Sequence, residues 1–189
     1  HIPWSEVAQG PWALFTSGSK SFNIPAFTGA YGFIPEANAR DSYLQALKAR
    51  DGLSSPSVPA LVAHIAAYRD GAPWLDALRD YLQANMRYIA ATLNNAFPAL
   101  CWQPPEATYL AWIDLRPLNI DDHALQQALI AEQKVAIMPG YTYGPEGKGF
   151  LRLNVGCPRE KLERGVEGLI AALRSLSRFD VPHTGHAAG

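Results

Sequence analysis

The chain has 189 residues, 48% of them hydrophobic, and its 16 Lys and Arg against 17 Asp and Glu give a formal net charge of -1. Without blocks of like charge it offers no basic track for nucleic acid or an anionic membrane. No apolar run approaches the roughly 20 residues that span a bilayer, and the first residues lack the order of a signal peptide. The composition therefore predicts a cytoplasmic globular protein without nucleic-acid or membrane partners.

The first part of the chain is expected to be mostly helical after two short strands. Apolar runs at 13–16 and 27–34 predict buried strands on either side of a tight connection that contains Lys20. Proline near the start, glycine beyond the end and apolar residues near the helical period predict three helices. These helices are expected over 35–50, 58–69 and 73–97.

After Pro98 the pattern changes to an α+β unit, with strands in one layer and helices in the other. Alternating apolar runs predict the strands, and an aspartate cap and a proline start predict the helices. The strands are expected over 108–115, 134–140 and 150–157, and the helices over 121–133 and from Pro158 onward. The residues that follow, 177–189, are expected to form a disordered tail.

Lys20 lies in the sequence TSGSKSFN, where small hydroxyl residues and a glycine precede it. A lysine with a depressed pKa is a nucleophile that forms Schiff bases with aldehydes such as pyridoxal phosphate. Ser17 and Ser19 offer hydroxyl donors for phosphate oxygens, and Gly18 allows close approach of the backbone. By itself, however, the same pattern is typical of a surface turn with an exposed lysine.

Arg152 lies in the predicted strand FLRLNVGC. The strand period places Leu151, Leu153 and Val155 on one face and turns Arg152 to the other. A guanidinium held on a rigid strand can bind a carboxylate through two parallel hydrogen bonds, which a lysine cannot reproduce. The alternative is a solvent-facing arginine of an antiparallel sheet.

Other candidate motifs are weaker indications of function. The glycine-rich segment 139–150 does not fit a phosphate-binding P-loop and is followed by a strand, so we expect a mobile loop or a lid. His64 and the other internal histidines form neither a set of metal ligands nor a triad, and we treat them as structural or solvated. Cys101 and Cys157 lack metal-binding spacing and are expected to be buried free thiols. We therefore predict no metal site.

Lys20 and Arg152 together carry a family resemblance. The sequence SGSKSFNIPAF resembles the lysine segment of fold-type I pyridoxal-phosphate enzymes, and FLRLNVGCPREKLERGVEGL resembles their C-terminal strand and helix. With PEATYLAWIDLR (105–116), these motifs are similar to the MalY/PatB-type cystathionine β-lyases, or carbon-sulfur β-lyases, of the class I/II aminotransferase superfamily. The resemblance covers roughly residues 1–176.

The resemblance implies a role for each matching residue. Lys20 is the expected catalytic, Schiff-base lysine, Ser17 and Ser19 are expected to bind pyridoxal 5'-phosphate, and Arg152 is expected to bind the substrate carboxylate. Many aminotransferases of the superfamily have a phosphate-binding arginine eight residues after the lysine. Here that position is Thr28, as in the lyase branch.

The fold implied by the resemblance is α/β, the C-terminal part of a fold-type I PLP-dependent transferase fold. Residues 1–72 would complete the large cofactor-binding domain and 73–176 would form the small α+β domain. The implied activity is β-elimination from cystathionine or cysteine-type amino acids to pyruvate, ammonia and a thiol, in a homodimer. The alternatives are a class I/II aminotransferase and a non-catalytic isolated domain. Because the partners of the cofactor ring cannot be located, we expect the chain alone to bind the cofactor weakly and to be inactive.

Overall fold

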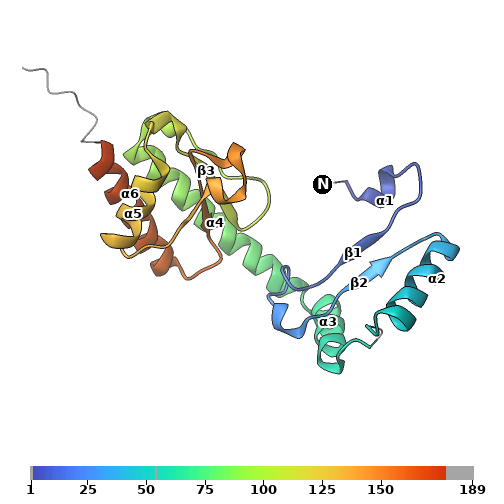
Figure 1. Ribbon diagram of the computed structural model, residues 1–189. Coiled ribbons are helices and arrows are strands. Elements are labelled where there is room, and N and C mark those ends of the chain that lie inside the picture. The colour runs from blue at the N-terminus through green and yellow to red at the C-terminus, as the bar shows by residue number, and fades with distance from the viewer. Residues whose placement is uncertain (1, 54, 178–189) are drawn as a thin grey trace, which may run out of the picture. The chain divides into compact units, whose positions relative to one another are not determined.

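A computed structural model describes residues 2–53 and 55–177 and divides the chain into two compact units (Figure 1). The first unit is His1–Leu78 and the second is Arg79–Gly189. The boundary falls within the long helix α4, Ala72–Ala96. Each unit is described by itself below.

The first unit combines a two-stranded ribbon with helices. β1 and β2 are antiparallel, with Phe15 opposite Gly32. Glu36 caps α2 through the amides of Asn38 and Ala39, and Ser57 caps α3 through the amide of Ala60, so polar side chains satisfy the first free N–H groups. The elements are α1 Trp4–Val7, β1 Leu14–Thr16, a 3-10 turn Pro25–Phe27, β2 Tyr31–Phe33, α2 Ala37–Gln45, a π turn Ala46–Arg50 and α3 Val58–Asp70.

The two predicted strands of this unit exist, but the expectation that they are buried is wrong. Phe15 and Phe33 are each 53% exposed, and no residue of either strand is buried. A ribbon of two strands has no second layer of its own, and among the described residues its covering is limited to side chains such as Tyr43, whose ring lies 5.2 Å from that of Phe15. The run 27–34 is also shorter as a strand, because Pro25–Phe27 forms a 3-10 turn.

The second unit is the predicted α+β arrangement. Its sheet has the order β3-β5-β4, and both pairs are antiparallel. Asp121 caps α5 through the amide of Ala124 at 2.8 Å, as its position before the apolar run predicts. The elements after α4 are β3 Leu110–Asp114, α5 Asp122–Ala131, β4 Met138–Pro139, β5 Phe150–Asn154 and α6 Arg159–Ser177, with 3-10 turns at Pro98–Leu100, Arg116–Leu118, Gly140–Tyr143 and Pro145–Gly147.

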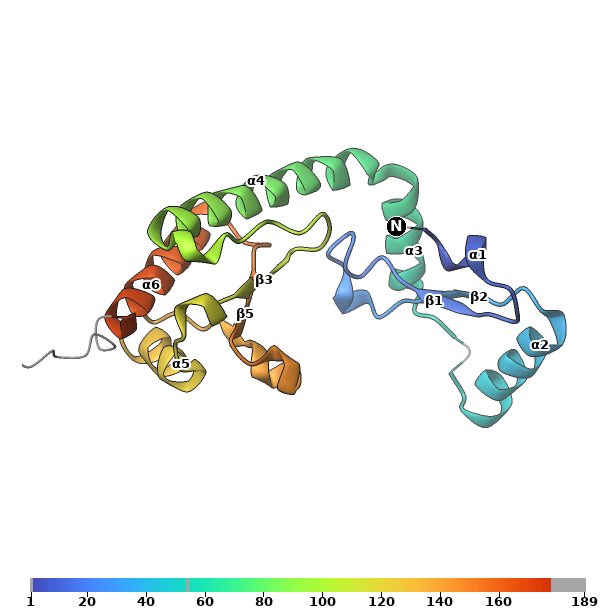
Figure 2. The same ribbon diagram turned by 90° about the horizontal axis from the view of Figure 1, so that it is seen from above.

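Helices α4, α5 and α6 cover one face of this sheet (Figures 1 and 2). Their apolar stripes meet the strand residues Ile113 and Leu151 and, just after β5, Val155, all of which are at most 2% exposed. Burial of a side chain of this size contributes about 1.5–3 kcal/mol.

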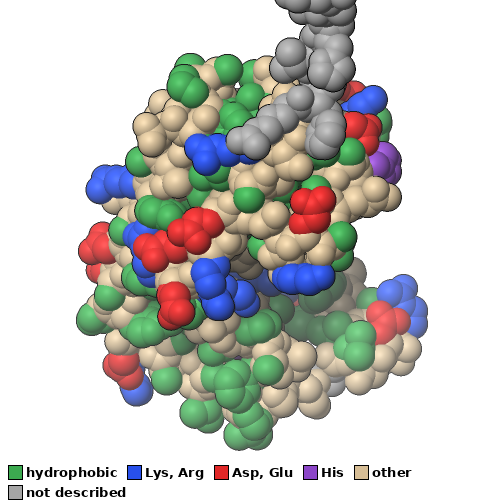
Figure 3. All heavy atoms as spheres, turned by 90° about the vertical axis from the view of Figure 1, so that its left-hand side faces the viewer, with side chains coloured by type: hydrophobic (Ala, Val, Ile, Leu, Met, Phe, Trp, Pro, Cys, Tyr) green, Lys and Arg blue, Asp and Glu red, His purple; other side chains and the backbone are tan. Residues whose placement is uncertain are grey.

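On the face drawn in Figure 3, charged side chains of both signs are interspersed. Among the described residues, no helix has the length and apolar character needed to cross a bilayer.

Several sequence expectations need correction in this unit. β4 has two residues instead of the predicted 134–140, because Lys134 adopts a positive φ of 56° and Pro139 has no N–H for a sheet hydrogen bond. The segment after it, which the sequence predicts to be a mobile loop or a lid, contains two 3-10 turns. Cys101 is a free thiol but exposed, not buried. Apart from Ser177, which ends α6, the expected tail lies outside the described residues.

A single buried amide ties α4 to the end of β5. Asn85 is 0% exposed, and its Nδ2 donates to the carbonyl of Val155 at 2.9 Å and to that of Cys157 at 3.3 Å. A buried carbonyl that loses its donor keeps its desolvation cost without compensation. Asn85 therefore holds the connection between β5 and α6 in place.

Replacing Asn85 by Ala is expected to lower the free energy of unfolding by about 2 kcal/mol, because the carbonyl of Val155 loses its side-chain donor and that of Cys157 keeps only the hydroxyl of Tyr81. Urea denaturation followed by far-UV circular dichroism measures the change. Gln83→Ala, on an exposed position of the same helix, is the matched control and should change stability by less than about 0.5 kcal/mol. Equal effects of the two substitutions would contradict this role of Asn85.

Candidate functional site

Lys20 lies in a hydrogen-bonded turn between β1 and β2. The amide of Phe22 donates to the carbonyl of Gly18 at 2.9 Å, and the amide of Ile24 donates to that of Ser19 at 3.2 Å. Gly18 is buried beneath the turn, whereas Lys20 is exposed. The backbone of the turn is thus held in place while the lysine amine remains accessible.

The hydroxyl groups on either side of Gly18 lie close together. Ser17 Oγ donates to Ser19 Oγ at 2.9 Å and accepts from the amide of Ser19 at 3.3 Å. Both hydroxyls are half-buried and can rotate toward another acceptor. The turn therefore presents two hydroxyl donors and an amine within four residues, a set that fits an anionic aldehyde cofactor such as pyridoxal phosphate.

Aromatic contacts anchor the turn on α3 and on the start of α4. The ring of Phe22 meets that of Tyr68 edge-on at 5.1 Å and lies 6.5 Å from that of Trp74. Tyr68 also shares a hydrogen bond of 2.7 Å with the hydroxyl of Tyr31 on β2. Aromatic pairs of this kind contribute about 0.5–1.5 kcal/mol beyond the area that they bury. Phe22, two residues after Lys20, therefore acts as the anchor of the lysine turn.

Arg152 occupies the middle of β5, on the face opposite the helices, as the alternation predicts. Its neighbours in register are Trp112 on β3 and Met138 on β4. Leu151 and Leu153 on either side are buried, whereas Arg152 is half-buried. Its guanidinium carbon lies 4.5 Å from the ring centroid of Tyr143, within the range of a cation–π contact.

A second arginine on this side of the sheet provides a comparison. Arg116 also lies 4.5 Å from a ring centroid, that of Phe150, but it binds the carboxylate of Asp114 through hydrogen bonds of 2.8 and 2.7 Å. The side-chain hydrogen bond from Arg116 lowers the pKa of Asp114. In the described part of the chain, no ion pair involves Arg152. Of these two arginines, Arg152 is therefore the one that can receive an external carboxylate.

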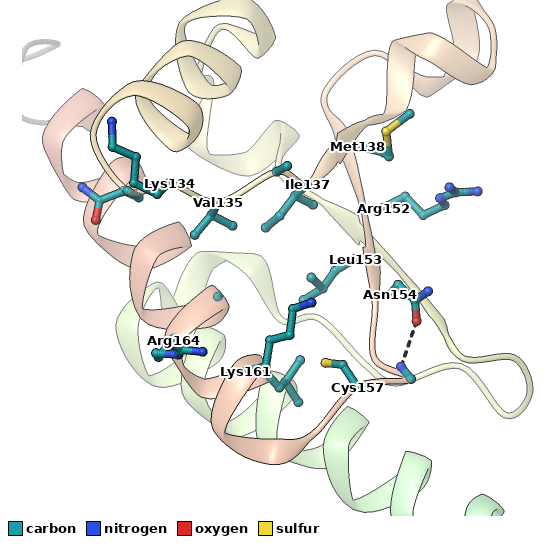
Figure 4. Close-up of a pocket in the computed structure, with 15 residues that line it drawn as sticks. Lys134, Val135, Ile137, Met138, Arg152, Leu153, Asn154, Cys157, Lys161 and Arg164 are labelled. Carbon is teal, nitrogen blue, oxygen red and sulfur yellow. Dashed lines mark hydrogen bonds between the residues drawn. The ribbon is translucent and has the colours of Figure 1, made fainter.

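A cavity of about 610 Å³ lies between the segment before β4, β5 and the first turns of α6 (Figure 4). Lys161 points into the space between Ile137 and β5, whereas the guanidinium of Arg152 and the amide of Asn154 point away to the other side. Arg152 is thus at the wall of the cavity, and its charged group belongs to the outer face of the sheet.

The structure therefore brings Ser17, Ser19 and Lys20 together in one turn, and it places Arg152 in the other unit. Sequence reasoning missed the aromatic rings around Arg152. Tyr143 lies in the segment that the sequence predicts to be a mobile loop or a lid, and Trp112 is 38% exposed on the face of Arg152. The alternation of the predicted strand 108–115 could have indicated that Trp112 faces away from the core, and its place beside Arg152 follows from the register of β3 with β5.

Comparison of the sequence with models of known protein families identifies the family of this chain. The family Aminotransferase class I and II matches residues 1–169. The chain belongs to this family.

Within this family, two curated proteins are similar to the chain over most of its length. The chain is 72% identical over 176 residues to Protein MalY of Escherichia coli, covering 93% of this chain and 45% of the relative. It is 38% identical over 155 residues to Cystathionine beta-lyase PatB of Bacillus subtilis, covering 82% of this chain and 40% of that relative. The chain thus spans less than half the length of these relatives.

The chain is also similar in fold to a solved structure. The PLP-bound C-S lyase from Staphylococcus hominis superposes with a TM-score of 0.75 at 29% identity, over 85% of this chain and 41% of that one. The chain therefore has part of the α/β fold of PLP-dependent aminotransferase-family enzymes, as the motifs around Lys20 and Arg152 predicted.

The aromatic anchor generates a prediction on Tyr68. Partial burial, followed by the hydrogen bond and the charge repulsion from Tyr31, raises the pKa of Tyr68 from 10.0 to about 12. Because the pKa is raised on folding, this contribution to stability is complete below pH 10 and is lost as the pH rises toward 12. In spectrophotometric titration at 295 nm, the difference between the wild-type chain and Tyr68→Phe should titrate near the upper value.

The Tyr31→Phe substitution should lower the pKa of Tyr68 part of the way toward its ordinary value, because the hydrogen bond is lost while the burial remains. Tyr43→Phe, a tyrosine of the same unit that packs on Phe15 instead, is the control and should leave it unchanged. A difference titration centred on the ordinary tyrosine pKa would contradict the assignment.

Proposed function

We propose that this chain works within a PLP-dependent carbon-sulfur β-lyase that acts on cystathionine or related cysteine-type amino acids. One observation carries the proposal. Lys20 is exposed beside two hydroxyl groups, in a chain whose other motif arginine, Arg152, has no carboxylate partner among the described residues. The likeness to the lyase PatB supports this substrate class.

The residues of the lysine turn would hold the cofactor. Lys20 would bind its aldehyde carbon, and the hydroxyls of Ser17 and Ser19 would donate to its phosphate oxygens. When bound, pyridoxal phosphate supplies an electron sink that stabilises negative charge at the substrate α-carbon.

Arg152 and Lys20 would act on different groups of the substrate. Arg152 binds the α-carboxylate through two parallel hydrogen bonds and so fixes the orientation of the amino acid. The Lys20 amine would act as the general base that removes the α-proton of the substrate. The electron pair left at the α-carbon would form a double bond to the β-carbon while the β-carbon–sulfur bond breaks with its pair on sulfur. The thiolate would take up the proton held by Lys20 and leave as a thiol. Water hydrolyses the remaining enamine to pyruvate and ammonia.

The proposal extends to organisation. We assign residues 1–72 to the cofactor-binding domain and 73–176 to the small domain of a cytoplasmic homodimer. Because the chain spans less than half of its relatives' length, we expect it to hold the cofactor weakly by itself. The parent protein would be the active enzyme.

An aminotransferase is the second candidate, because the matching family includes this reaction. The two activities share the removal of the α-proton and separate afterwards: transamination requires a keto-acid acceptor and releases no thiol. Thr28 at the position of the usual phosphate-binding arginine favours the lyase.

A chimera tests the function of Lys20. This chain replaces the aligned segment of E. coli MalY, whose 72% identity favours correct packing. With pyridoxal phosphate and cystathionine, the chimera should form pyruvate and a thiol in equal amounts. Lys20→Ala should lower this rate by at least about a thousandfold, because the base and the cofactor attachment are lost together.

Lys48→Ala, an exposed lysine of the same unit, is the matched control and should retain the wild-type rate. Borohydride reduction followed by peptide mapping should find the cofactor on Lys20. Turnover only with a keto-acid acceptor and without thiol would establish the aminotransferase instead. No cofactor binding by a folded chimera would favour a non-catalytic module.

Arg152→Lys in the same chimera is expected to lower kcat/KM about 30-fold, mainly through a higher KM. A lysine keeps the charge but loses the second parallel hydrogen bond to the substrate carboxylate. Steady-state kinetics of pyruvate release measure the effect.

The matched control is Arg116→Lys, since Arg116 rests on an aromatic ring at the same distance but already binds Asp114. It should change kcat/KM by less than about threefold. An equal loss in both variants would contradict substrate binding by Arg152.

A further inference from the structure

His64 on α3 is held in one ring orientation. Its Nδ1 lies 2.8 Å from the carbonyl oxygen of Ala60, one helical turn earlier. A carbonyl can only accept, so Nδ1 carries the proton of this hydrogen bond. The ring is thereby fixed in a single tautomer and plane before any contact with the rest of the unit is considered.

The ring lies against two glycines, one on each side of Lys20 in the sequence. A Cβ atom at Gly29 would lie 2.8 Å from Cε1 of His64, and one at Gly18 would lie 3.4 Å from its Cδ2. The ring therefore occupies the space that a side chain at Gly29 would need. Its Nε2 is buried and has no hydrogen-bond partner among the described residues.

An unpartnered buried nitrogen costs free energy, so an apolar side chain would be the less costly filler at this position. What the histidine supplies is shape and fixed orientation: a flat ring, tied to the helix backbone, beneath the chain before and after the lysine.

His64 and Tyr68 share a face of α3, because residues four apart on a helix are neighbours. His64 supports Gly18, two residues before Lys20, and Tyr68 contacts Phe22, two residues after it. The lysine turn is thus supported from below on both sides, and Lys20 lies between the two contacts.

We propose that His64 is a positioning residue for Lys20: its ring, oriented by Ala60, sets the path of the backbone that presents the lysine amine. This role goes beyond the structural or solvated histidine expected from the sequence, and it rests on the proposed function of Lys20. In this role His64 acts through the backbone of the lysine turn.

Hydrogen exchange of the chain alone tests the support independently of any cofactor. His64→Ala should make the amides of Phe22 and Ile24, both bonded within the turn, exchange at least about tenfold faster. The amide of Gly71, bonded to Ala67 at the end of α3, should keep its protection. Ile65→Ala, at the neighbouring position that is 60% exposed, is the matched control and should alter neither.

The consequence for Lys20 is measured in the MalY chimera as the fraction of borohydride-fixed cofactor found on Lys20 by peptide mapping. His64→Ala should reduce this fraction at least about fivefold while Ile65→Ala leaves it unchanged. His64→Phe, which retains a flat ring, should restore at least half of it.

The outcomes separate the two proposals. If the wild-type chimera does not label Lys20, the cofactor assignment fails, while the exchange result still decides the role of His64 as a support. Unchanged exchange and labelling in a folded His64→Ala chain would overturn that role. Should His64→Ala fail to fold, His64→Phe decides: near-native protection of the Phe22 amide supports the proposal, and loss of that protection in a folded chain contradicts it.

Discussion

Burial of alternate residues of β5 is the constraint on which the second unit depends. Leu151 and Leu153 lie beneath three helices, and a strand can turn only every second side chain to that layer. Arg152 is therefore forced to the opposite face, where its neighbours are aromatic rings. Because β5 is the central strand, the guanidinium stands on a strand that is paired on both sides.

In the first unit, Lys20 is also presented to solvent, but no sheet covered by helices supports it. Its ribbon of two exposed strands provides little support for the turn between them. Helix α3 supplies that support instead, through the ring of His64 beneath Gly18 and the ring of Tyr68 beside Phe22. Precise presentation of an amine from a turn requires such contacts, because a turn without them retains many backbone conformations.

The two arginines on the outer face of the sheet show how similar surroundings produce different chemistry. Both guanidinium groups rest on aromatic rings at 4.5 Å, but one is joined to Asp114, whereas the other has no ion-pair partner among the described residues. An arginine cannot lose its proton in a protein, so an unpaired one in a half-buried position favours a ligand carboxylate. This difference, more than the presence of an arginine, supports the proposed substrate site.

The sequence by itself determined the order of the elements in the second unit, the cap at Asp121, the outward direction of Arg152 and the family, because periodicity, capping and motif order are local properties of the chain. Only the tertiary structure decided that the ribbon of the first unit is exposed, that Tyr143 lies against Arg152 and that His64 supports the lysine turn. Each of these depends on contacts between residues distant in the sequence. The spacing that brings His64 beneath Gly18 and Gly29 arises from the packing of α3 on the turn, and no local pattern encodes that packing.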